Sequence, residues 1–97
     1  MRRLSFHPQV KRDISAAARY YEQQQEGLGA DFRAETFRAI QLTETYPLSG
    51  TPVDGTVRRQ VIRRFPYHLL YRVDGEEIFL LSVAHQHRQP ERWRRRL

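Results

Sequence analysis

The sequence predicts an α+β fold with the element order β-α-α-β-β-β, in which a helical hairpin packs on one face of an antiparallel sheet. Two observations carry this prediction. Apolar residues recur with helical spacing over residues 10–43, and after residue 56 they alternate with polar ones, as they do in strands. With 97 residues the chain is long enough for one core, so residues 1–97 are assigned to a single domain.

The first half predicts a short strand and two helices. Residues 2–6 alternate, and Pro8 suits the first turn of the following helix, where a missing N–H costs nothing. The apolar face of the first helix carries Val10, Ile14, Ala17, Ala18 and Tyr21. Gly27 and Gly29 interrupt the pattern. The second helix repeats the spacing with Phe32, Thr36, Ala39, Ile40 and Thr43 and ends at Tyr46. Because the linker is short, we expect the helices to be antiparallel.

The second half predicts three strands and a tail. Residues 47–55 contain two prolines and two glycines and predict a loop. The predicted strands are residues 56–63, 67–73 and 77–84, and Asp74-Gly75 is a hairpin turn signal. The last strand is almost continuously apolar, as expected for a central strand buried on both faces. The tail, residues 88–97, is basic, and we expect it to be partly disordered, with Trp93 as its one candidate anchor.

Positive charge is concentrated in the second half. The net charge is +6, and residues 55–97 hold ten arginines against four acidic residues, whereas acidic and basic residues balance over 1–54. Lys11 is the only lysine. Arginine binds carboxylates and phosphates through a planar fork of donors, which favours an acidic or polyanionic partner. A high-GC genome also explains an excess of arginine over lysine, but not its uneven distribution.

Composition excludes several classes of chemistry. The chain contains no cysteine, which excludes disulfides, thiol catalysis and cysteine metal sites. No apolar run reaches the roughly 20 residues of a membrane span, so we expect a cytoplasmic protein with no membrane partner. No motif indicates a cofactor.

Several short segments together resemble one known superfamily. They are Ala18–Glu22, Gly27–Gly29 with Phe32, Val57–Arg59, Arg63–Tyr67, Leu70–Val73, Val83–His85, Arg88–Pro90 and Trp93. In this order, and over nearly the whole chain, they resemble the RelE/ParE superfamily of type II toxins. The most specific part is the combination of Arg-Phe-Pro-Tyr, Tyr-Arg-Val and a final His-x-x-Arg-x-Pro.

The resemblance implies a bacterial toxin that is encoded beside an antitoxin and forms a hetero-oligomer with it. Antitoxins of this superfamily wrap the toxin's helices and sheet with a flexible segment, and repress their operon through a DNA-binding part. RelE-like toxins cleave mRNA in the ribosomal A site, whereas ParE-like toxins poison DNA gyrase. The helices and the turn Phe65-Pro66-Tyr67 look more like the ParE, or plasmid-stabilisation, branch. We therefore expect growth arrest through gyrase, with ribosome-dependent mRNA cleavage as the alternative.

The nuclease alternative has its own candidate residues. Without a metal, RNA cleavage needs a base for the 2′-OH proton, cations for the phosphorane charge and an acid for the leaving oxygen. His85 and His87 lie two residues apart at the end of the last strand, so an extended backbone would point both to one face. Arg63, Arg64 and Arg88 would supply the cations.

Two departures from the RelE pattern count against that alternative and against an enzyme. RelE-like toxins typically use lysines on the middle strands and a tyrosine near the C-terminus, but the only lysine is Lys11 and no tyrosine follows Tyr71. A histidine at a strand end, such as His85, is more often a structural, hydrogen-bonded residue than a catalytic base. The pair His85 and His87 has only Glu91 as a nearby acid, so no metal is expected.

The candidate partner-binding residues are arginines of the predicted sheet and its turn, namely Arg58, Arg59, Arg63, Arg64 and Arg72. On neighbouring strands they would hold an acidic antitoxin segment through charge-assisted hydrogen bonds. The alternative is a solvated edge, because edge strands often carry charge. A third interpretation is an inactive toxin that is kept only for antitoxin binding.

Overall fold

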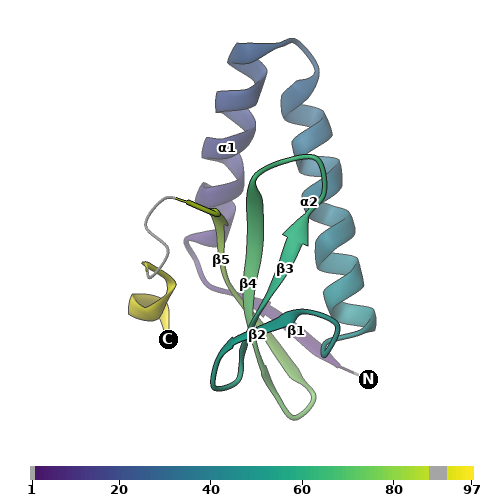
Figure 1. The fold of residues 1–97 in the computed structure, drawn as a ribbon, viewed down its shortest axis with the longest axis vertical. Helices are drawn as coiled ribbons and strands as arrows, with labels where there is room; N and C mark the ends of the chain where they lie inside the picture. Colours follow the sequence, from purple (N-terminus) through teal and green to yellow (C-terminus); the bar gives the residue numbers. More distant parts are fainter. Residues whose placement is uncertain (1, 88–91) are drawn as a thin grey trace.

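The computed structural model describes residues 2–87 and 92–97 and confirms the α+β fold class. In chain order the elements are β1 (Arg3–Phe6), α1 (Val10–Gln24), α2 (Leu28–Thr45), β2 (Thr51–Asp54), β3 (Val57–Ile62), β4 (Tyr67–Asp74), β5 (Glu77–His85) and the 3₁₀ helix η1 (Arg92–Arg96). The strands form one sheet in the order β1-β5-β4-β3-β2. Both helices lie on one face of this sheet, as a hairpin (Figure 1).

The sheet is mixed, which differs from the expected antiparallel sheet. β1 runs parallel to β5, with Leu4 opposite Ile78, whereas the other three strand pairs are antiparallel. A parallel pair requires a long crossover, and the helical hairpin between β1 and the rest of the sheet contributes to it. Alternation in a short strand says nothing about its direction, so the sequence did not reveal this pairing.

The segment expected to be a loop contains a short edge strand. β2 pairs with β3, with Thr51 opposite Arg59, and all four of its residues are exposed. Pro52 removes one backbone donor, which a strand tolerates at the edge of a sheet.

The loop before β2 is fixed by Tyr71. The Tyr71 hydroxyl donates to the carbonyl of Pro47 at 2.6 Å and accepts from the N–H of Gly50 at 3.1 Å. A Cβ at position 50 would overlap this hydroxyl and the carbonyl of Arg59, so only glycine fits. Burial raises the pKa of Tyr71, so the phenol stays protonated and remains a donor.

Helix α2 begins at Leu28, four residues before the first apolar position used to predict it. The Glu22 carboxylate of α1 accepts hydrogen bonds from the N–H groups of Gly27 and Gly29, both at 3.0 Å. These bonds satisfy donors that a helix N-terminus otherwise leaves unpaired. A Cβ on Gly29 would lie 2.6 Å from the carbonyl oxygen of Ala18, so glycine lets the two helices approach closely.

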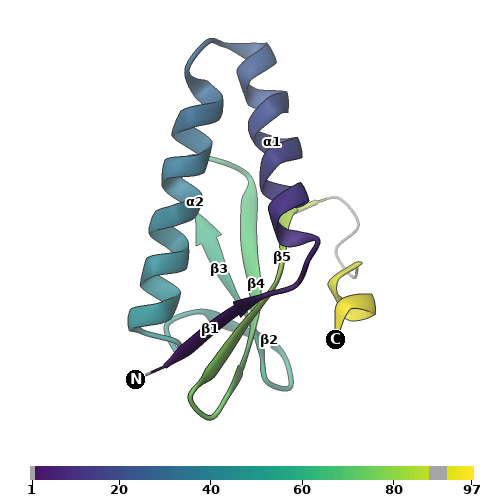
Figure 2. The same cartoon turned by 180° about the vertical axis from the view of Figure 1, so that it is seen from behind.

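Two apolar clusters hold the sheet, one on each face. The larger lies between the helices and the sheet and contains Val10, Phe32, Ile62, Leu69, Tyr71, Ile78 and Leu80, among others. The smaller lies on the other face and is formed by Val57, Leu70, Leu81 and Trp93, with Phe79 packed against it. Trp93 is 3% exposed. The rear view shows η1 beside the sheet on the side of β5 and α1 (Figure 2).

No helix in the described part of the chain is both long and apolar enough to cross a membrane.

Candidate functional site

The alternation of β3 sends its two adjacent arginines to opposite faces of the sheet. Arg58 lies opposite Tyr71, on the face covered by the helices. Its guanidinium donates to the carbonyl oxygens of Leu48 at 3.2 Å and Gly50 at 2.8 Å. Arg58 therefore joins Tyr71 in fixing the loop before β2, and this contact occupies part of its donor fork.

Arg59 and Arg72 lie on the other face, with the smaller apolar cluster. Arg59 is opposite Leu70 and Arg72 is opposite Val57, which makes the two arginines diagonal neighbours. Diagonal side chains on adjacent strands are about 7–8 Å apart. The Arg72 guanidinium lies over the ring of Phe79, 5.3 Å from its centroid. The two cations thus form a small basic surface beside an aromatic ring.

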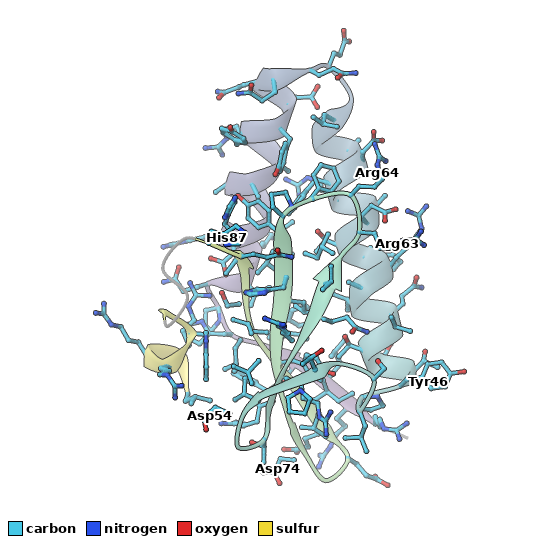
Figure 3. All side chains as sticks on the ribbon, viewed as in Figure 1. Tyr46, Asp54, Arg63, Arg64, Asp74 and His87 are labelled. Carbon is cyan, nitrogen blue, oxygen red and sulfur yellow. The ribbon has the colours of Figure 1, made fainter. Side chains whose placement is uncertain are left out.

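Arg63 and Arg64 lie in the turn between β3 and β4, next to α2 (Figure 3). Arg64 has a φ of 74°, in the left-handed region, and its guanidinium pairs with Asp31 of α2 at 3.4 Å. Both partners are about half exposed, so this ion pair contributes little stability. Arg63 is exposed and lines a groove against α2.

The five candidate partner-binding arginines therefore do not form one patch. Arg58 is turned inward, Arg59 and Arg72 share the face away from the helices, and Arg63 and Arg64 lie beside α2. Among the described residues, no acidic side chain pairs with Arg59, Arg63 or Arg72. Arg58 has no acidic partner among them either, but its guanidinium already donates to two carbonyl oxygens, so Arg59, Arg63 and Arg72 are the candidates most open to an acidic partner.

The two histidines of the nuclease alternative do lie together. β5 ends at His85, and the chain turns immediately, so the extended backbone assumed from the sequence does not continue to His87. The N–H of His87 donates to Nδ1 of His85 at 3.1 Å, and the two ring centroids are 5.9 Å apart. This bond requires an unprotonated Nδ1, which places the proton of a neutral His85 on Nε2.

The cations proposed to act with these histidines lie elsewhere. Figure 3 shows Arg63 and Arg64 on the α2 side of the molecule and His87 on the α1 side. Arg88 lies outside the described residues. The structure thus brings His85 and His87 together without bringing Arg63 and Arg64 to them.

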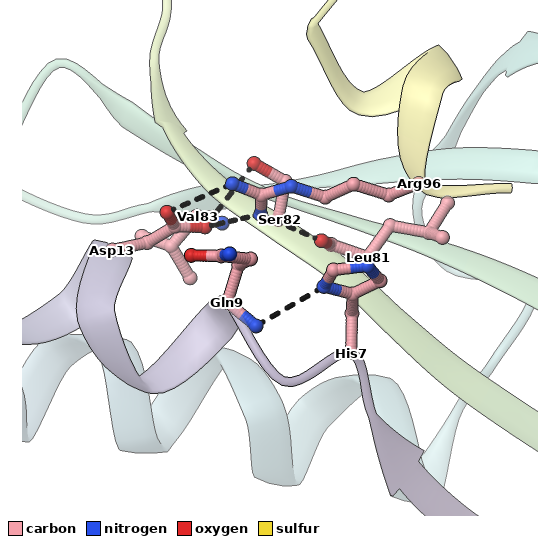
Figure 4. Close-up of polar contacts among 7 residues, drawn as sticks. All are labelled: His7, Gln9, Asp13, Leu81, Ser82, Val83 and Arg96. Carbon is pink, nitrogen blue, oxygen red and sulfur yellow. Dashed lines mark hydrogen bonds and ion pairs between the residues drawn. The ribbon is translucent and has the colours of Figure 1, made fainter.

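His85 lines a cleft of about 360 Å³ that holds an ion pair the sequence did not suggest. Asp13 of α1 and Arg96 of η1 line the same cleft, together with Tyr20, Tyr67 and Ser82. Arg96 donates to both carboxylate oxygens of Asp13, at 2.6 and 3.2 Å, and to the carbonyl of Leu81 at 2.9 Å (Figure 4). The partners are 83 residues apart, so no local pattern could have paired them.

This ion pair also covers the edge of β5 beyond the end of β1. The Asp13 carboxylate accepts from the N–H of Val83 at 3.1 Å, while Arg96 donates to the carbonyl of Leu81. Two side chains thus satisfy backbone groups that a neighbouring strand would otherwise bind. Covering an exposed edge in this way prevents it from pairing with another chain.

His68 is a buried imidazole on β4, 8% exposed, between Val61 of β3 and Ala84 of β5. Its Nε2 has no hydrogen-bond partner in the described structure. Burial lowers the pKa of His68, and the charges of Arg59 and His85 lower it further. The folded protein therefore favours neutral His68.

We expect acid to destabilise the fold through His68. Its pKa is about 6.5 in the unfolded chain and lower in the folded one, so between these values the unfolded state binds more protons. The free energy of unfolding should therefore fall as the pH drops below about 6.5, and level off below the folded pKa. Denaturant titrations at pH 7.5 and pH 5.5 measure this loss.

The matched variants are His68→Leu, which cannot titrate, and His87→Gln at an exposed position. The loss on acidification should be smaller in His68→Leu and unchanged in His87→Gln. An equal loss in all three proteins would contradict the assignment to His68.

Within residues 2–87 and 92–97, no three histidine, aspartate or glutamate side chains gather closely enough to hold a metal ion.

The fold and its charged surfaces define a small, basic α+β protein with exposed cations on two separate surfaces.

Comparison with known proteins gives the family. The profile of the family described as "ParE toxin of type II toxin-antitoxin system, parDE" matches residues 4–90. The chain therefore belongs to the ParE toxin family of type II toxin–antitoxin systems, and the resemblance found in the sequence is confirmed. No curated protein matches it.

A solved structure shares the fold. One chain of the structure described as "Chromosomal ParDE TA system from P. aeruginosa" superposes with a TM-score of 0.76 at 18% sequence identity. The match covers 88% of this chain and 96% of that chain.

Proposed function

We propose that this protein is a cytoplasmic ParE-like toxin that acts on DNA gyrase and that a cognate antitoxin neutralises. The family match over residues 4–90 is the observation that carries this proposal. Membership in a toxin family gives the class, and the target and the antitoxin are our inference from it. The agreement in fold with a chain of a ParDE system supports the same branch of the superfamily.

The antitoxin contributes an acidic, flexible segment that binds the unpaired arginines. Arg59 and Arg72 present cations on one face, and Arg63 presents one beside α2. A segment that extends around the edge of the sheet reaches both surfaces, whereas a compact partner docks on one. Carboxylates on such a segment form charge-assisted hydrogen bonds with the guanidinium groups, so binding weakens as salt increases.

Gyrase is favoured over mRNA cleavage by the arrangement around His85. Nδ1 of His85 already accepts a backbone hydrogen bond, and Arg63 and Arg64 lie on the other side of the molecule. The nuclease alternative also lacks the middle-strand lysines and the late tyrosine of RelE-like toxins.

Expression without the antitoxin should arrest growth, and the first lesion identifies the target. We expect the purified protein to inhibit gyrase supercoiling, while transcripts from arrested cells keep intact coding regions. The variants His85→Ala and His87→Ala should retain toxicity, because neither side chain carries the reaction under this proposal. Transcript ends that map inside translated codons, together with loss of toxicity in well-folded histidine variants, would favour the nuclease and overturn the gyrase proposal.

A further inference from the structure

Two inner strands, β5 and β3, each extend beyond the end of the strand beside them, but their exposed backbone groups are not satisfied in the same way. β5 extends past the end of β1, and there Asp13 and Arg96 satisfy the N–H of Val83 and the carbonyl of Leu81. β3 likewise extends past the end of β2, which stops at Thr51, opposite Arg59. Beyond that point β3 continues to Ile62.

The register of β3 and β4 shows which backbone groups of this extension point outward. The carbonyl of Thr56 accepts from the N–H of Val73 at 3.2 Å, which marks these two residues as a hydrogen-bonded pair. In an antiparallel ladder such pairs alternate, so the backbone N–H and C=O groups of residues 58, 60 and 62 bond to β4. Those of Val57, Arg59 and Val61 point away from β4. The backbone of Arg59 pairs with Thr51 of β2. Val61 lies beyond the end of β2, so its N–H and C=O point to an open edge.

A groove beside this edge is lined by both apolar and charged residues. It has a volume of about 190 Å³ and lies between α2 and β3, with Leu42, Ala39, Arg38 and Glu35 on the helix and Val61 and Arg63 on the other side. Leu42 is 45% exposed and Val61 is 55% exposed. Arg38 pairs with Glu35, whereas Arg63 has no acidic partner in the described part of the chain.

We propose that the open edge of β3 at Val61 receives an extended segment of the antitoxin as an added strand. This inference rests on the proposed function. The segment exchanges backbone hydrogen bonds with Val61, and its side chains alternate between the two faces of the sheet. One lies beside Val61 on the face away from the helices, the next lies beside Leu42 of α2, and a carboxylate is directed to Arg63. Strand addition of this kind obtains affinity from the main chain and specificity from the side-chain groove.

The charges argue for an acidic segment rather than a second copy of this chain. Pairing two copies through this edge would bring Arg63 of one copy towards an edge that carries Arg59 and Arg63 of the other. The chain carries a net charge of +6, so self-association is opposed by repulsion, while an acidic peptide is attracted. The ion pair that covers β5 leaves no comparable opening for backbone pairing there.

Hydrogen exchange on the complex tests the proposal directly. The toxin is co-expressed with the product of the reading frame adjacent to its gene, and amide exchange is compared with that of the free toxin. We expect the Val61 amide to exchange at least tenfold more slowly in the complex, because the added strand binds its N–H.

Two pairs of variants separate the backbone contact from the charge. Val61→Pro removes an N–H that bonds nothing within the described chain, and proline is tolerated at an open edge. It should weaken the complex about tenfold, the size expected for one lost hydrogen bond and its contacts. Val61→Thr keeps the N–H and should bind within about twofold of the unmodified toxin.

Arg63→Glu should weaken binding and its salt dependence, whereas Arg12→Glu on the exposed surface of α1 should change neither greatly. Thermal melts confirm that each variant is folded.

The outcomes distinguish this inference from the function on which it rests. If a neutralising complex forms but the exchange of Val61 is unchanged and Val61→Pro binds normally, strand addition is overturned and the toxin–antitoxin function stands. If the free toxin alone protects Val61 as its concentration rises, the occupant is a second copy and the proposal fails. If the adjacent product neither binds nor neutralises, both are overturned.

Discussion

Replacing Trp93 by alanine is expected to lower the free energy of unfolding by about 3–5 kcal/mol, as for other buried tryptophans. Trp93 is 3% exposed and fills the cluster of Val57, Leu70 and Leu81 on the face away from the helices. Removing it leaves a cavity and exposes apolar strand residues. For a domain of this size, each kcal/mol lowers the melting temperature by roughly 4–8 °C. Because Trp93 is the only tryptophan, unfolding is best followed by circular dichroism.

Leu97→Ala is the matched control for this change. Leu97 lies in the same terminal segment but is 58% exposed, so its truncation should change stability by less than about 0.5 kcal/mol. A loss below about 1 kcal/mol in Trp93→Ala would contradict the packing of η1 on the sheet.

The second large effect is expected at the ion pair of Asp13 and Arg96. Their side chains are only 17% and 10% exposed, so Asp13→Ala leaves a nearly buried guanidinium without its counter-charge and the N–H of Val83 without an acceptor. Removing one partner of a buried pair costs about 3–5 kcal/mol. Denaturant unfolding measures the loss.

A double-mutant cycle shows whether the loss belongs to the pair. Arg96→Met combined with Asp13→Ala should cost clearly less than the sum of the single changes, because no uncompensated charge remains. The exposed pair Arg3 and Glu77 is the control, and Glu77→Ala should cost no more than about 1 kcal/mol. Additive losses at Asp13 and Arg96 would contradict a direct interaction.

The helices were predictable because their pattern is local. Helical spacing of apolar residues places them on one face whatever the rest of the chain does, and α1 and α2 contain the apolar positions it predicts. The prediction that Pro8 lies in the first turn of α1 was wrong, because α1 begins at Val10. The start of α2 was not predictable, since it depends on Glu22 of the other helix. β2 was not predicted because its segment contains Pro52. A proline is compatible with strand pairing at the edge of a sheet, and the sequence did not show that this segment lies there.

The candidate site was only partly predictable. The sequence identified the arginines and placed them on adjacent strands, but the sorting of Arg58, Arg59 and Arg72 between two faces depends on the register with β4. The sequence also identified His85 and His87 as candidate residues. It gave no indication of Asp13 and Arg96, which line the same cleft as His85.

By itself, the sequence determined the fold class, the helical hairpin, the toxin family and the excess of cations in the second half. Each of these depends on residue order, periodicity or composition. Tertiary structure alone decided the parallel pairing of β1, the packing of Trp93 and the covering of the β5 edge by Asp13 and Arg96. It also decided that β3 stays open at Val61. Strand pairing and packing bring together residues that are far apart in the chain. Which residues come into contact depends on the complete sheet, because its hydrogen bonds and the burial of its apolar side chains form together.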